Sequence, residues 1–245
     1  MAKAASNSSR SALQAATAQP TDEHSCCKTP RQGRQAKAQL PQAGLKAKPP
    51  AQAAPPQVRK LAGAFAGIRH SRHVTDLALS MFDQLADRLD MNANDRLLLE
   101  CAGLLHDIGW VIGQAGHHKE SMRMILAQAD LGLSRPDQLM VANIARYHRR
   151  ALPSPGHANY RRLGRSDRRR VRILAGMLRL ADGLDRQHLQ RIGWVKLTLT
   201  AGLLIVECQT IGDAADEQST AKTKGNLLEH ALSRRLQLEW CSIPA

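Results

Sequence analysis

Aromatic side chains are scarce in this sequence, and long apolar runs are missing. Phe, Trp and Tyr make up 3% of the 245 residues, whereas hydrophobic residues as a group reach 43%. A core of this composition consists mainly of aliphatic side chains and favours helices. No apolar run approaches the roughly 18 residues of a membrane-spanning helix, and the N-terminus lacks the apolar core of a secretory signal. We therefore expect no membrane association.

A disulfide framework is also missing. The five cysteines, at positions 26, 27, 101, 208 and 241, are odd in number and follow no framework spacing. Cys101 and Cys208 lie in apolar runs, where cysteine acts as a small core residue. We infer a reducing compartment and expect a cytoplasmic protein. Because the Ala-, Ser- and Lys-rich start resembles an organellar transit peptide in composition, an organelle is the alternative location.

Acidic residues are few relative to basic ones, which leaves a formal net charge of +14. This excess favours anionic ligands such as phosphates, nucleic acid or an anionic surface, without choosing among them. Residues 1–57 are rich in Ala, Gln and Pro and contain almost no large apolar side chains. We expect this segment to be a disordered basic tail. It is either a tether for anionic partners or a solvated extension.

Hydrophobic periodicity divides the rest of the chain into two parts. A helical period over residues 58–190 predicts helices at about 71–89, 94–105, 119–130, 134–148 and 166–185. The expected N-caps are Asn94 or Asp95, Ser134 and Ser166. Residues 191–245 read as strands at 194–200 and 203–208, a helix at about 216–232 and a strand at 235–240. We expect a mainly α fold, with a helical bundle followed by a small β-β-α-β appendix.

The most informative stretch is residues 101–109, an apolar helical run that ends in His106 and Asp107 and is broken by Gly109. An unpaired carboxylate is strongly disfavoured in an apolar setting, and a divalent cation would satisfy both side chains. The alternative is an ordinary helix end with a stabilising His and a surface Asp. His70 and Asp182 complete a mixed nitrogen and oxygen set, which suits Mn, Fe, Zn or Mg.

Three motifs resemble the H…HD…D signature of the HD-domain phosphohydrolase superfamily: His70-Ser-x-x-Val74, Leu105-His106-Asp107-Ile-Gly109 and Leu180-Ala-Asp182. A closer resemblance covers about residues 68–190. Its motifs are Gly116-His-His-Lys119, Ala145-Arg-Tyr-His-Arg149-Arg-Ala-Leu-Pro153 and Asp167-Arg-Arg-Arg-Val-Arg172. They are similar to the C-terminal HD-like region of the exopolyphosphatase/guanosine pentaphosphate phosphatase (Ppx/GppA) family. The appendix also resembles the end of those proteins.

The resemblance implies a metal site at His70, His106, Asp107 and Asp182. In the Ppx/GppA family the phosphohydrolase chemistry is attributed to N-terminal actin-like domains with Gly-rich phosphate loops. Residues 1–67 contain nothing that could form such a domain. We therefore expect any catalysis to come from the HD site itself.

Further histidines raise the prospect of a second metal, because some superfamily members use extra His ligands. His148 matches one such position, whereas Glu120 occupies the other, where related sequences commonly carry His. His117 and His118 are substitute candidates. Asp185, one helical turn after Asp182, either orients a ligand or pairs with a nearby arginine.

Between residues 146 and 172 there are ten arginines and one acid, Asp167. Such crowding of like charge is unfavourable unless anions neutralise it, and Arg offers planar, bidentate contacts to phosphate. The expected phosphate-binding residues are Lys119, Arg146, Arg149 and Arg150. A nucleic-acid stripe is the rival interpretation, although few aromatics are present for base stacking.

The first functional hypothesis is a metal-dependent phosphohydrolase acting on a phosphate-rich anion such as a nucleotide or polyphosphate. Lys119, Arg146 and Arg149 would stabilise charge on the phosphoryl oxygens, and His148 would ligate a second ion or act as acid and base. The second hypothesis is a non-catalytic module that binds polyphosphate or a guanosine polyphosphate. A third is a partner subunit of a separate actin-like phosphatase, and a homodimer is a further option.

Overall fold

The computed structural model describes residues 53–65 and 67–243, so most of the predicted disordered tail, residues 1–57, lies outside the described residues. Residues 53–57 are described and belong to the folded part. Ala54 is 1% exposed, and helix α1 (Pro56–Gly63) begins two residues before the predicted boundary. Pro56 suits the first turn of a helix because proline has no amide hydrogen to leave unpaired there.

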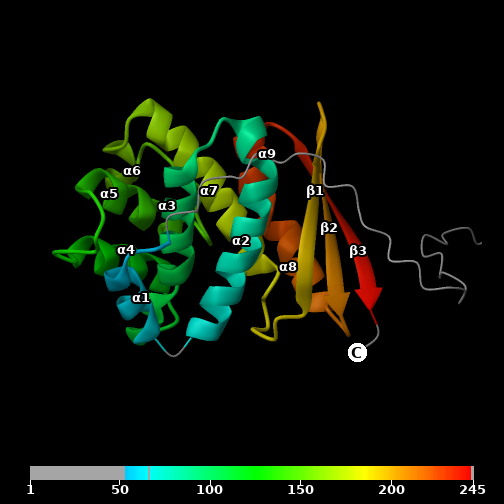
Figure 1. Cartoon of the computed structure of the whole chain (residues 1–245), viewed down its shortest axis with the longest axis horizontal. Coiled ribbons are helices and arrows are strands. Elements are labelled where there is room, and N and C mark those ends of the chain that lie inside the picture. The colour runs from blue at the N-terminus through cyan, green and yellow to red at the C-terminus, as the bar shows by residue number, and fades with distance from the viewer. Residues whose placement is uncertain (1–52, 66, 244–245) are drawn as a thin grey trace, which may run out of the picture. The chain divides into compact units, whose positions relative to one another are not determined.

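The structure confirms a mainly helical fold with a small sheet at its C-terminal end (Figure 1). After α1, the helical part contains α2 (Ile68–Leu89), α3 (Ala93–Leu105), the short 3-10 helix η1 (Ile108–Val111), α4 (His117–Ala127), α5 (Arg135–Arg146), α6 (Ala158–Arg161) and α7 (Arg165–Gly183). Among the described helices, none combines the length and apolar character that a membrane crossing requires.

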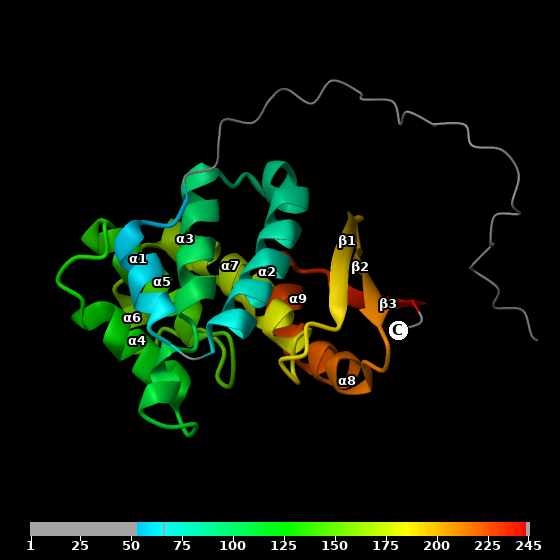
Figure 2. The ribbon, with the colours of Figure 1, turned by 60° about the horizontal axis from the view of Figure 1, so that its bottom comes forward.

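Helix α7 is the centre of the packing. It contacts α2, α3 and α5 on the helical side and α8 and α9 on the C-terminal side (Figure 2). Every residue from Ile173 to Gly183 is buried. Burial of the aliphatic side chains of this segment supplies the main driving force for assembly. Asp182 is therefore carried into the interior by the helix on which the fold is built.

Two of the three predicted N-caps are wrong. Asn92, rather than Asn94 or Asp95, caps α3, with its side chain accepting hydrogen bonds from the amides of both of those residues. Asp95 completes the capping box as the third residue of the helix. Ser134 caps α5 as predicted, by accepting from the amide of Asp137.

Ser166 does not cap α7, because the helix already includes Arg165 and the capping position is Gly164. Helix α2 also starts earlier than expected, so His70 lies in its first turn rather than before it. Helix α4 starts two residues early, at His117, directly after Gly116. The φ of Gly116 is +77°, a backbone conformation that favours glycine.

The C-terminal part is a three-stranded sheet with two helices. Strands β1 (Ile192–Leu199) and β2 (Leu203–Ile211) cover the first two predicted strands and form an antiparallel hairpin. Strand β3 (Arg235–Ile243) pairs parallel to β2, in the order β1-β2-β3. A parallel connection needs a crossover, which α8 (Ala215–Lys224) and α9 (Asn226–Leu232) supply.

The single helix predicted at 216–232 is wrong, because the helix is interrupted at Gly225. A Cβ atom at this position would collide with the Leu236 side chain of β3, so the break lies at a close contact between the crossover and the sheet. Alternate residues of β2 are buried, including Leu204, Val206 and Cys208. One face of the sheet therefore packs on the helices and the other is open.

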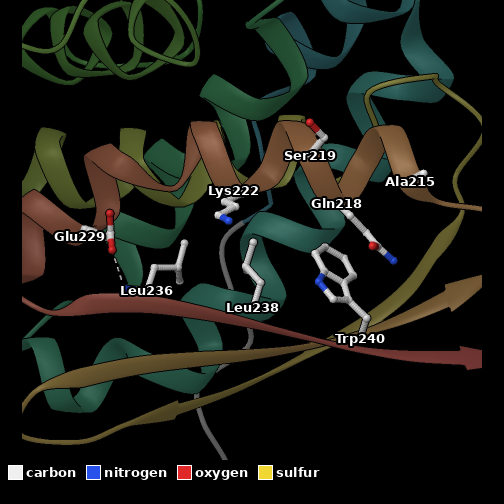
Figure 3. A pocket seen from close by; sticks show the side chains of 8 residues that line it. All are labelled: Ala215, Gln218, Ser219, Lys222, Glu229, Leu236, Leu238 and Trp240. Carbon is white, nitrogen blue, oxygen red and sulfur yellow. Dashed lines mark hydrogen bonds between the residues drawn. The ribbon is translucent and has the colours of Figure 1, made fainter. Parts of the chain in front are cut away.

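A cavity of about 640 Å³ lies between the crossover and β3 (Figure 3). Leu236, Leu238 and Trp240 of β3 line one wall, while Gln218 and Lys222 of α8 project from the other. No residue of the His/Asp cluster described below lines this cavity.

Candidate functional site

Six buried side chains from separate elements converge in the helical part of the structure. They form two groups of metal-ligand type, His70 with His106 and Asp182, and Asp107 with His117 and His148. Within each group the candidate ligand atoms lie within 4.8 Å of one another. Helices α2, α4 and α7, the end of α3 and the turn after α5 each contribute at least one of these side chains.

The four predicted ligands are brought together in this cluster. The Nε2 atom of His70 lies 3.4 Å from Oδ1 of Asp182 and 3.8 Å from Oδ2 of Asp107. The Nε2 atom of His106 lies 3.6 Å from the same Asp107 oxygen. Residues separated by more than a hundred positions along the chain therefore surround one point in the core.

Asp107 joins the two groups. Its Oδ2 atom faces His70 and His106, while its Oδ1 atom lies 3.1 Å from Nε2 of His117 and 3.4 Å from Nε2 of His148. Asp107 would therefore contribute one oxygen to an ion held by each group.

The four histidines of the cluster are each held by a hydrogen bond at Nδ1, the ring nitrogen opposite the one that faces the carboxylates. Each Nδ1–H donates to an oxygen: that of His70 to Asp185 Oδ2 at 2.8 Å, and those of His106, His117 and His148 to the carbonyls of Gly103, Gln114 and Ala145 at 2.7, 2.9 and 2.7 Å. These acceptors fix the orientation of each ring. The Nε2 atoms of all four rings are therefore directed into the cluster, as metal ligation requires.

Several of these inward-facing atoms have no hydrogen-bond partner among the described residues. The atoms that are buried without such a partner include Nε2 of His70, Nε2 of His106 and Oδ1 of Asp107. Buried polar atoms are rarely left unsatisfied, because each costs about 1–3 kcal/mol. The orphaned atoms and the mixed nitrogen and oxygen donors fit a divalent metal ion.

Electrostatics keep the two carboxylates charged. Burial alone would raise the pKa of Asp107 and of Asp182. Contacts with His106 and His117 outweigh burial for Asp107, whose pKa is lowered. For Asp182, the charge of Lys224 and the contact with His70 hold the pKa well below its usual range.

The histidines of the cluster differ in their protonation. Burial lowers the pKa of His148 well below its usual value, so this ring is neutral at pH 7. Burial also acts to lower the pKa of His70, but its contacts with the carboxylates of Asp182 and Asp185 reverse the effect and raise it to about 9. His70 therefore carries a proton at pH 7 in the metal-free protein.

Gly109 allows the turn after Asp107 to pack closely against α4. Its amide donates to Oγ of Ser121 at 2.9 Å, which draws α4 against the turn that follows Asp107. A Cβ atom at Gly109 would collide with the carbonyl of His117 and the amide of Ser121. Only glycine lets the two segments approach closely enough for His117 to reach Asp107.

Three other predicted site residues, Asp185, His118 and Glu120, belong to neither ligand group. Asp185 accepts from His70 and so orients a candidate ligand, one of the two roles expected for it. His118 belongs to neither ligand group, and burial together with Arg146 and Arg149 lowers its pKa to about 3. Glu120 is paired with Arg123 at 2.7 Å.

A cavity of about 130 Å³ opens onto the cluster. Asp107, His117, His148 and Asp182 contribute to its lining, together with the cations Arg149, Arg186 and Lys224. Of the four predicted phosphate-binding residues, only Arg149 lines this cavity. Lys119 and Arg150 are exposed elsewhere, and the Arg146 guanidinium lies 5.7 Å from the centre of the Tyr147 ring.

Sequence reasoning missed four residues of this site, one of which is Arg186 in the cationic lining. Lys224, in the last turn of α8, forms an ion pair with Asp182, with side-chain exposures of 19% and 11%. His188 stacks on His70 with ring centres 3.7 Å apart, and Trp110 stacks on His117 at 5.0 Å. Lys224 and His188 belong to no motif that resembles a known family. Trp110 directly follows the Asp107–Gly109 turn, and that position was the only available signal.

A comparison with known protein families shows to which family the chain belongs. The sequence model described as Ppx/GppA phosphatase, domain III, matches residues 57–220, which is more than half of the chain. The match covers the whole helical part, the hairpin and the start of α8. The chain therefore belongs to the Ppx/GppA phosphatase family and carries its domain III.

Proposed function

We propose that this protein is a metal-dependent phosphohydrolase of the HD type that acts on a phosphate-rich anion. The observation that carries the proposal is the set of four Nε2 atoms, each oriented by an oxygen acceptor behind it, facing two charged carboxylates. Membership of a phosphatase family supports the same class of chemistry.

His70, His106, Asp107 and Asp182 would hold one divalent ion, and Asp107, His117 and His148 form a candidate set for a second. An ion bound there supplies Lewis-acid activation of water and of the phosphoryl group. Asp185 holds the His70 ring in register through a charge-assisted hydrogen bond of 2.8 Å. Neutral His148 is suited to ligation at pH 7, because its lone pair is not occupied by a proton.

Positive charge at the cavity supports an anionic substrate. Arg149, Arg186 and Lys224 line a space that contains two carboxylates. These cations would bind phosphoryl oxygens and stabilise the negative charge that develops on them during transfer. The small volume, about 130 Å³, suits one phosphoryl group rather than a folded chain of them.

A non-catalytic module that binds phosphate is the second candidate, and one observation favours it. The ammonium group of Lys224 already neutralises Asp182, so the cluster has an internal cation in the absence of metal. In that case Arg149 and Arg186 would bind the phosphate ligand, and Asp107 would have a structural role.

The two candidates are separated by elemental analysis of the purified protein and by phosphate release from nucleotides and polyphosphates. For the enzyme, turnover depends on added metal and is lost in Asp107→Asn, while Asp87→Asn, an exposed carboxylate of α2, leaves it unchanged. The binding module is favoured instead if the parent protein shows no turnover and if its phosphate binding survives Asp107→Asn but is lost in Arg149→Ala.

A further inference from the structure

A buried carboxylate of the C-terminal part lies outside both candidate ligand groups. The side chain of Glu217, in the first turn of α8, is 1% exposed. Its Oε1 atom accepts a hydrogen bond of 3.0 Å from the backbone amide of Gln187, while its Oε2 atom is buried without a partner among the described residues. A buried carboxylate that is only half satisfied lowers the stability of the fold, so an uncharged side chain would serve a purely structural purpose better. The retained charge points to a role for the contact with Gln187.

The amide that Glu217 holds belongs to the connection between α7 and β1. Arg186 and His188 of this connection line the cavity of about 130 Å³ at the cluster, and the His188 ring stacks on a candidate metal ligand. The backbone here is strained, because His188 and Gln190 have φ values of +60° and +52°, which residues other than glycine rarely adopt. Such a backbone persists only where surrounding contacts hold it.

Two carboxylates hold this connection in place. Asp185 accepts a hydrogen bond of 2.8 Å from the amide of Gln190, and Glu217 accepts one from the amide of Gln187. Arg186 lies between these anchors in the chain, and within the part of the chain that the structure describes its side chain makes no hydrogen bond or ion pair of its own. The place of the Arg186 guanidinium at the cavity therefore depends on the backbone that carries it.

Helix α8 reaches the site at two points on one of its faces. Glu217 and Lys224 are seven residues apart, which is close to two helical turns and places them on the same side. Lys224 pairs with Asp182 of α7. A Cβ atom at Gly183, the last residue of α7, would lie 3.1 Å from the Cα atom of Ala221, so the two helices pack closely here. This packing makes α8 a firm support for the connection that follows α7.

We propose that Glu217 is a positioning residue of this site, which holds the amide of Gln187 and thereby keeps Arg186 at the wall of the cavity where a bound phosphoryl group would lie. The inference rests on the proposed function, because it requires that an anion binds beside the His/Asp cluster. Glu217 belongs to neither candidate ligand group, so it acts on the affinity for the anion and not on the affinity for the metal.

Calorimetry on the full chain tests this division with two probes. Mn²⁺ is titrated into chelator-treated protein, and inorganic phosphate is titrated into protein saturated with Mn²⁺. Glu217→Met removes the acceptor with little change in volume, and should weaken phosphate binding about 10-fold, as the loss of one charge-assisted hydrogen bond does. Mn²⁺ affinity should stay within about 2-fold of wild type, because the candidate ligands lie outside residues 186–190. General damage to the fold would weaken both.

A conservative variant and a matched control define the contact. Glu217→Gln keeps a carbonyl oxygen for the amide of Gln187, so it should bind phosphate within about 2-fold of wild type. Asp216→Ala is the control. Asp216 is exposed in the same turn of α8 and accepts from the side chain of Gln187 rather than from its backbone. Its loss should leave both affinities unchanged.

Arg186→Ala identifies the group through which Glu217 acts. This variant should also weaken phosphate binding about 10-fold, and adding Glu217→Met to it should cause no further loss, because changes within one set of contacts are not additive. The positioning role is overturned by additive losses, by wild-type phosphate affinity in Glu217→Met, by an equal loss in Glu217→Gln, or by a matching loss of Mn²⁺ affinity. Each of these results leaves the phosphate site of the wild-type protein in place. If wild-type protein saturated with Mn²⁺ binds no phosphate, the proposed function fails as well.

Discussion

Replacing Lys224 with methionine should strengthen metal binding, which is the opposite of what the loss of an active-site residue usually does. The Lys224 ammonium and a divalent ion both require the carboxylate of Asp182. A metal that enters the cluster must therefore displace this ammonium or tolerate its repulsion. Methionine preserves most of the side-chain volume and removes the charge.

The size of the effect follows from the ion pair. Side-chain exposures of 19% for Lys224 and 11% for Asp182 make it partly buried. A hydrogen bond between charged groups in such a setting contributes about 1.5–3 kcal/mol. Because about 1.4 kcal/mol corresponds to a factor of ten, Lys224→Met should raise metal affinity by about 10- to 100-fold.

Calorimetric titration of chelator-treated protein with Mn²⁺ measures this change, and Lys222→Met is the matched control. Lys222 lies on the same helix but lines the separate cavity beside β3 (Figure 3). Without metal, Lys224→Met should unfold at lower denaturant, because Asp182 loses its counter-ion, and saturating Mn²⁺ should remove the difference. Unchanged or weaker Mn²⁺ binding in Lys224→Met would refute competition, whereas no binding by either protein would refute the metal site itself.

Three further predictions follow from the contacts around the cluster. Asp185→Ala frees the Nδ1–H of His70 and should weaken Mn²⁺ binding about 10- to 100-fold by calorimetry; unchanged affinity would show that Asp185 does not position the ring. Because the folded pKa of His70, about 9, exceeds its ordinary value of 6.5, its contribution to the stability of the chelated protein is complete below pH 6.5 and is lost as pH rises through 9. Denaturant unfolding should report a decrease of about 1–3 kcal/mol over this window, and a His70→Gln variant with the same decrease would exclude His70 as its source. Gly109→Ala should destabilise the fold by about 1–3 kcal/mol, because the new Cβ collides with His117 and Ser121; a melting temperature equal to wild type would contradict this.

The sequence alone predicts the parts of the site that short motifs carry. His106 and Asp107 are adjacent, and the resemblance to the HD signature adds His70 and Asp182, so their convergence could be expected and is seen in the structure. Lys224 could not be found in this way. It belongs to the last turn of a polar helix, and only the three-dimensional path of the crossover brings it to Asp182.

A choice between His117 and His118 also needed the structure. Neighbouring residues on a helix point about 100° apart, so the residue at which α4 begins decides which ring faces inward. The helix was predicted to start near Lys119, but Gly116 starts it at His117. The early start directs His117 to Asp107 and leaves His118 outside both ligand groups.

The position of Lys224 has a practical consequence for anyone who shortens this chain. The family match ends at residue 220, four positions before the lysine, and a fragment cut there would also remove α9 and β3. It would expose the surface of α7 at Gly176, whose backbone packs directly on Leu228. Such a fragment would test a different ligand environment around Asp182, and its metal affinity would overstate that of the intact protein.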